Sequence, residues 1–127
     1  MGKKSIEQYD RRDEIVNNTE DSMAQVAHLE DNSFDQTIRS GVVLVDFYAD
    51  WCGPCRMLTP VLEQVAKESA GQVMVAKLDI DKNQKVASAY QVTSVPTMIL
   101  FKNGKEVGRL VGLRDAKGIK EFIAKAS

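Results

Sequence analysis

Two cysteines separated by two residues are the part of this sequence best suited to chemistry. Cys52 and Cys55 are the only cysteines in the 127-residue chain. A structural disulfide between them would close so short a loop that it would contribute only about 2 kcal/mol. A structural zinc ion needs four ligands, and beyond the two thiols the chain offers one distant histidine, His28. The spacing therefore favours a redox-active dithiol.

The sequence around the cysteines changes from a strand pattern to a helix pattern, and this change gives the two thiols different roles. Residues 42–49 are almost continuously apolar, whereas residues 52–69 place leucine, valine and alanine at helical spacing. A thiol at a helix N-terminus faces unpaired amide N–H groups and the positive end of the helix dipole, and both favour the thiolate. We therefore predict that Cys52, exposed by the turn, attacks first and that Cys55 resolves.

Three neighbouring residues complete the candidate site. Gly53 allows a tight turn near an incoming substrate, and Pro54 occupies the first helical turn, where its missing N–H is harmless. Asp46 is the one carboxylate in the apolar strand. It either lies at a solvated sheet edge or is buried, in which case burial raises its pKa and lets it accept a proton near neutral pH.

The remaining elements alternate between helix and strand. Capping residues at 31–33 precede a short helix ending near Gly41, and Asn103-Gly104 indicates a hairpin. The predicted elements are a helix at 34–38, strands at 42–49 and 72–80, helices at 52–69 and 82–90, strands at 97–101 and 106–111, and a last helix capped by Asp115. This order predicts an α/β fold with a central mixed sheet and helices on both faces.

Composition limits the possible functions. Hydrophobic residues make up 43% and charged residues 28% of the chain, as in ordinary soluble globular proteins. The formal net charge of −1 argues against nucleic-acid binding, and no apolar run is long enough to span a membrane.

The first 25 residues differ from the rest, because they carry four basic and six acidic side chains and few aliphatic ones. They show neither a secretory signal nor a transit peptide. We expect residues 1–25 to be a flexible N-terminal extension and residues 26–127 to be the folded domain.

The chain resembles the thioredoxin family over residues 26–127. The motifs that carry the resemblance are the segment 45–55 (VDFYADWCGPC), Lys77, the segment 95–97 (VPT) and Val111-Gly112. Their order and spacing agree across the domain. A departure is Tyr48, which stands where many thioredoxins carry a second tryptophan.

The resemblance implies the thioredoxin fold and a set of residue roles. Asp46, through water, helps to deprotonate Cys55, and Lys77 is the lysine partner of that aspartate. From the residues alone, Lys77 is equally an ordinary strand lysine with its amine at the surface. The implied substrate groove is formed by Trp51, Val95, Pro96 with a cis peptide bond, and Gly112. Without the family, Trp51 fits a core, Pro96 fits the start of a strand and Gly112 fits a plain turn.

The function that follows is protein-disulfide reduction by dithiol–disulfide exchange in the cytoplasm. The resemblance implies a monomer that binds no cofactor or metal and receives electrons from an NADPH-dependent flavoprotein, thioredoxin reductase. The other partners that the resemblance implies for this chain are disulfide-containing substrate proteins. Two alternatives stay open, namely a redox-independent binding subunit of a larger assembly and a thiol oxidant or disulfide isomerase.

Overall fold

The computed structural model describes residues 26–126, and the proposed N-terminal extension lies outside the described residues. The elements, in chain order, are β1 (Val26–Leu29), α2 (Phe34–Ile38), β2 (Val42–Tyr48), α3 (Gly53–Glu68), β3 (Met74–Asp79), α4 (Gln84–Ala89), β4 (Thr97–Lys102), β5 (Lys105–Val111) and α5 (Ala116–Ala126). The predicted α/β architecture is confirmed. No helix within these residues is long and apolar enough to cross a bilayer.

The five strands form one mixed sheet in the order β1-β3-β2-β4-β5. β1, β3 and β2 run parallel, while β4 and β5 pair antiparallel to their neighbours. The sequence prediction did not include β1. This strand has only four residues, and the exposed His28 interrupts its apolar pattern, so local periodicity gave no signal.

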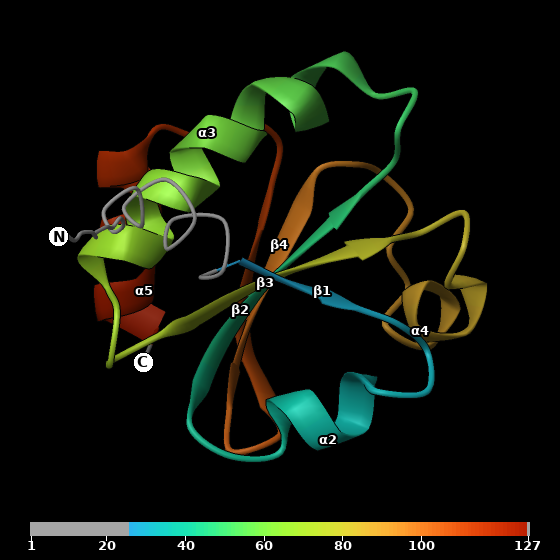
Figure 1. Cartoon of the computed structure of the whole chain (residues 1–127), viewed down its shortest axis with the longest axis horizontal. Coiled ribbons are helices and arrows are strands. Elements are labelled where there is room, and N and C mark those ends of the chain that lie inside the picture. Colours follow the sequence, from blue (N-terminus) through green and yellow to red (C-terminus); the bar gives the residue numbers. More distant parts are fainter. Residues whose placement is uncertain (1–25, 127) are drawn as a thin grey trace, which may run out of the picture.

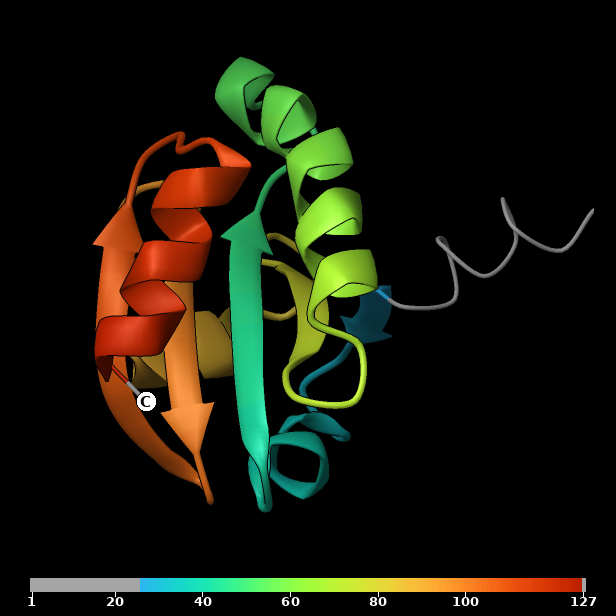
Figure 2. The ribbon, with the colours of Figure 1, turned by 90° about the vertical axis from the view of Figure 1, so that its left-hand side faces the viewer.

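Helices cover both faces of the sheet, as predicted. Helices α3 and α5 lie together on one face, while α2 and α4 lie on the other (Figures 1 and 2). Alternate residues of β2 therefore enter different cores: Leu44 packs with α3 and α5, and Val43, Val45 and Phe47 pack on the other side. Asp46 lies two residues after Leu44, so its side chain is on the same face of the sheet, the one that α3 covers.

The hairpin between β4 and β5 is closed by Asn103 and Gly104, as the sequence predicts. Both residues have positive φ, 51° and 87°, which is the geometry that a type I′ turn requires. Asn103 also exchanges hydrogen bonds with Gly41, since its N–H donates to the Gly41 carbonyl and its Oδ1 accepts from the Gly41 N–H. The end of the β2 strand opposite the cysteines is thereby fixed.

Candidate active site

Cys52 and Cys55 are joined by a disulfide at the start of α3, with their Cα atoms 5.3 Å apart. Cys52 is the N-cap of the helix, and its sulfur accepts a hydrogen bond from the Cys55 amide at 3.1 Å. Gly53 and Pro54 form the first helical turn between them. The strand-to-helix location predicted from the sequence is therefore confirmed.

The predicted exposure of Cys52 is wrong for this oxidised form. Only 4% of Cys52 is exposed, against 2% of Cys55. The disulfide holds both sulfurs against Ala49, and Tyr48, Ile80 and Val95 pack on the same cluster. A turn before a helix exposes the backbone, but here Tyr48, Ile80 and Val95 cover the side chain of Cys52.

The loop before β4 lies directly beside the disulfide. The Val95–Pro96 peptide bond is cis, as the resemblance implies. The Val95 carbonyl oxygen lies 3.7 Å from the Cys52 sulfur. Gly112, at φ 99°, donates its N–H to the Pro96 carbonyl at 2.8 Å. The structure thus brings Cys52, Val95, Pro96 and Gly112 together from three separate parts of the sequence.

Trp51 presents an apolar surface next to this cluster. It is 68% exposed, which contradicts a core role. Its indole N–H donates to Asp81 Oδ2 at 2.9 Å, so the ring is held in place although solvent surrounds it. Sequence reasoning missed Asp81, because an aspartate in a polar turn after β3 carries no distinguishing local signal.

Asp46 is completely buried, and the alternative of a solvated sheet edge is wrong because β2 is the central strand. No described residue donates a hydrogen bond to either carboxyl oxygen. Burial raises the pKa of this carboxyl from 3.8 to about 7, against the opposing effect of the Lys77 charge. Asp46 is therefore able to exchange a proton at neutral pH.

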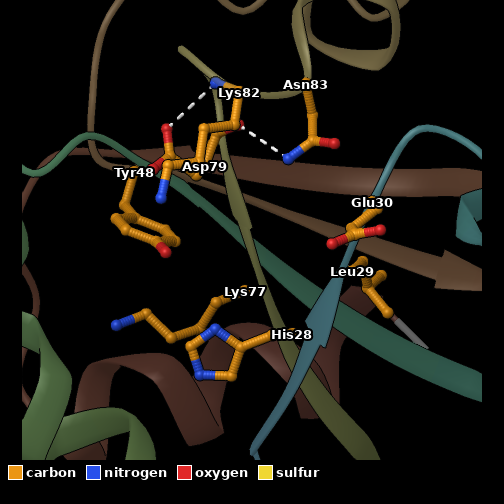
Figure 3. A pocket seen from close by; sticks show the side chains of 8 residues that line it. All are labelled: His28, Leu29, Glu30, Tyr48, Lys77, Asp79, Lys82 and Asn83. Carbon is orange, nitrogen blue, oxygen red and sulfur yellow. Dashed lines mark hydrogen bonds between the residues drawn. The ribbon is translucent and has the colours of Figure 1, made fainter.

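Lys77 lies beside Asp46 in the paired register of β2 and β3, on the face covered by α3. Its ammonium donates to Thr59 Oγ1 at 3.2 Å and lies 4.5 Å from the centre of the Tyr48 ring. Figure 3 shows the lysine chain extending past this ring in a pocket of about 370 Å³ that His28 and Asp79 also line. Neither Asp46 nor either cysteine lines this pocket.

The described residues contain no group of three histidine, cysteine or acidic side chains arranged to hold a metal ion. The candidate groups are a disulfide at the start of α3, and a buried carboxyl and a lysine on the sheet face that α3 covers. That set can exchange disulfides and transfer protons.

Comparison with known proteins agrees with this chemistry. The thioredoxin family profile matches residues 25–125. A thioredoxin of Chlamydia pneumoniae is 55% identical over 93 residues, which cover 73% of this chain and 90% of the relative. A thioredoxin of Chlamydia trachomatis serovar D is 52% identical over 103 residues, covering 81% of this chain and 98% of the relative.

A solved structure supports the same assignment. A mutant thioredoxin from Halobacterium salinarum NRC-1 is 44% identical and superimposes with a TM-score of 0.73, covering 80% of this chain and 90% of that one. The sequence match, the shared fold and the paired cysteines agree with one another. The chain belongs to the thioredoxin family and is a protein-disulfide reductase.

Proposed function

We propose that Cys52 is the attacking thiolate and Cys55 the resolving thiol. In the reduced protein, the Cys52 thiolate attacks one sulfur of a substrate disulfide. A bond forms between Cys52 and that sulfur, the substrate S–S bond breaks, and the second substrate sulfur leaves as a thiolate that takes up a proton. The product is a mixed disulfide between Cys52 and the substrate.

Cys55 then completes the exchange. Its proton passes, by way of a water molecule, to the Asp46 carboxylate, and the resulting thiolate attacks the Cys52 sulfur. The Cys52–Cys55 bond forms, the mixed disulfide breaks, and the first substrate sulfur leaves as a thiolate. Two electrons have passed from the dithiol to the substrate. Lys77 favours the ionised carboxylate by its charge.

The hydrogen bond from the Cys55 amide to the Cys52 sulfur carries this assignment. Donors directed at a sulfur stabilise its negative charge, and the N-terminal position on α3 adds the field of the helix dipole. Cys55 lies within the helix, past the N-cap position that Cys52 occupies. The thiolate therefore forms more readily on Cys52.

The direction of electron flow is tested by the equilibrium reduction potential of the Cys52–Cys55 pair in a glutathione buffer. We expect a value of about −270 mV, which is typical of a protein that reduces disulfides in other proteins. A value between about −180 and −120 mV is typical of oxidants and isomerases and would contradict the proposed function.

The substrate surface is proposed to consist of Trp51, Val95, Pro96 and Gly112 around the disulfide. A Trp51→Ala change is expected to raise KM for a protein disulfide about tenfold, because an exposed aromatic ring contributes well over 1 kcal/mol at a protein contact. The rate with a small aromatic disulfide should stay within about twofold, since that substrate covers little surface.

The matched control for Trp51 is Val107→Ala, which removes another exposed apolar side chain from β5 near the hairpin. Steady-state kinetics with both substrates measure the difference. Equal KM increases in the two variants would show that Trp51 has no special part in substrate binding.

The other partners follow from the family. We propose that electrons come from an NADPH-dependent flavoprotein thioredoxin reductase, that the protein is a cytoplasmic monomer, and that residues 26–127 form the functional domain.

The proposal includes a passive role for residues 1–25. Removing residues 1–22 should then leave reductase activity and the free energy of unfolding nearly unchanged.

A further inference from the structure

The hydroxyl of Thr59 links the resolving cysteine to Lys77. Thr59 lies on α3 one turn after Cys55, and its Oγ1 donates to the Cys55 carbonyl at 3.4 Å. The same oxygen accepts a hydrogen bond from the Lys77 ammonium at 3.2 Å. One hydroxyl therefore contacts both the helical turn that carries Cys55 and the cation beside Asp46.

Thr59 is the only hydrogen-bond partner of the Lys77 ammonium within residues 26–126. The ammonium forms no ion pair there, although Asp46 is its register neighbour on β2. The Tyr48 ring contacts it from another side, and the pocket that Lys77 and Tyr48 both line gives the flexible lysine chain an alternative direction (Figure 3). The distance between the ammonium and Asp46 therefore depends on the bond to Thr59.

We propose that Thr59 is a positioning residue for the resolving step, whose hydroxyl holds the Lys77 ammonium beside the Cys55 turn and close to the Asp46 carboxyl. This inference rests on the roles proposed above for Asp46 and Lys77. It adds that α3, through the Thr59 hydroxyl, sets the position of the Lys77 ammonium, and that attraction to the Asp46 carboxylate does not.

Other charged and titratable groups surround Lys77. The groups that face it from the surrounding elements are His28 on β1, Asp46 and Tyr48 on β2, Asp79 on β3, Cys55 on α3, and the pocket residues Glu30 and Lys82. Asp79 accepts hydrogen bonds from two backbone amides after β3. Removing the Thr59 hydroxyl breaks none of those contacts.

Without the hydroxyl, the ammonium loses its acceptor, and the pocket gives it access to solvent. The Coulomb interaction with Asp46 then weakens with distance and with better solvation. Because the Lys77 charge lowers the pKa of Asp46, its withdrawal raises that pKa further. The carboxylate is then scarcer at neutral pH, and Cys55 loses its proton acceptor.

The test is a Thr59→Val variant that keeps the branched shape, with Thr59→Ala as a second variant should valine disturb packing. The Asp46 carboxyl of the full-length oxidised protein is titrated by carbon-13 NMR, with Asp46→Asn identifying its signal. We expect the midpoint to rise by about half a pH unit in both variants, equivalent to about a threefold smaller ionised fraction below the midpoint. Thr59→Ser should restore the original midpoint.

Thr37→Val is the matched control, because the Thr37 hydroxyl makes the same kind of bond to the carbonyl four residues earlier, in α2. It should leave the midpoint unchanged. Stopped-flow reaction of the reduced variants with an aryl disulfide gives a second readout. The second coloured thiolate is released when Cys55 resolves, and the pH profile of that phase should shift with the carboxyl.

Lys77→Met separates failure of this inference from failure of the proposed function. If Lys77→Met raises the Asp46 midpoint while Thr59→Val and Thr59→Ala do not, Lys77 acts without Thr59 and the inference is overturned. If Lys77→Met also leaves the midpoint unchanged, the proposed coupling between Lys77 and Asp46 is itself wrong.

Discussion

Replacing Cys55 with serine is expected to stop the reaction halfway, with the protein covalently attached to its substrate. Cys52 retains its position at the start of α3, so it can still attack a substrate disulfide. The serine hydroxyl cannot displace the Cys52 sulfur, because a neutral alcohol is a far weaker nucleophile than a thiolate. Multiple turnover should fall on the order of a thousandfold or more. Non-reducing electrophoresis and mass spectrometry measure the mixed disulfide.

Cys52→Ser is the matched control, since it removes the other sulfur of the same pair. It should be equally inactive but form no comparable complex, because Cys55 lacks the N-cap position that favours the Cys52 thiolate. Stable complexes with Cys52→Ser and none with Cys55→Ser would reverse the proposed roles. The double variant addresses the redox-independent alternative, since a purely structural binding role would survive it.

The local geometry around the cysteines could be predicted because the residues that form it are close along the chain. The segment from Asp46 to Cys55 contains the strand, the turn and the helix start, and each has a local signal. Val95, Pro96 and Gly112 are distant in sequence, and only the family resemblance placed them beside the cysteines. The structure shows the cause: the loop before β4 and the end of β5 meet at the Pro96 carbonyl.

Other features depend on packing that no local pattern reports. The short strand β1 exists because β3 offers it an edge, with Val26 and Leu29 buried in different cores. Thr59 sits at an unremarkable helical position, and its contact with Lys77 appears only when α3 lies across the sheet. The burial of both cysteines likewise depends on Val95 and Tyr48, which follow from tertiary structure.

Asp46→Asn is expected to make the protein more stable at neutral pH. The ordinary pKa of the carboxyl, 3.8, applies to the unfolded chain, and burial raises it to about 7 in the folded protein. Between these values the unfolded state releases the proton while the folded state keeps it, so rising pH favours unfolding. Above pH 7, the whole difference between the two pKa values lowers the free energy of unfolding by roughly 4 kcal/mol. Asparagine has no such ionisation and avoids this cost.

The expected signature is a pH dependence and not a constant gain. Denaturant unfolding of the oxidised protein should show the free-energy difference between Asp46→Asn and the parent increasing from pH 4 to about pH 7, then levelling off. Parallel curves across this range would contradict the raised pKa. Asp79→Asn is the control of opposite sign: this buried carboxylate accepts two backbone hydrogen bonds, and weakening them should cost about 1 kcal/mol.

The same substitution should slow the resolving step, because Asp46 is the proposed proton acceptor for Cys55. Loss of a general base typically reduces a rate by about a hundredfold or more, so the second thiolate release from an aryl disulfide should slow by that factor at pH 7. In the parent protein this rate should rise with pH around a midpoint near 7, and the dependence should disappear in the variant. A stabler protein that resolves slowly would show that the buried carboxyl is retained for proton transfer at the expense of folding free energy. A stabler protein with an unchanged resolving rate would assign that proton to another acceptor.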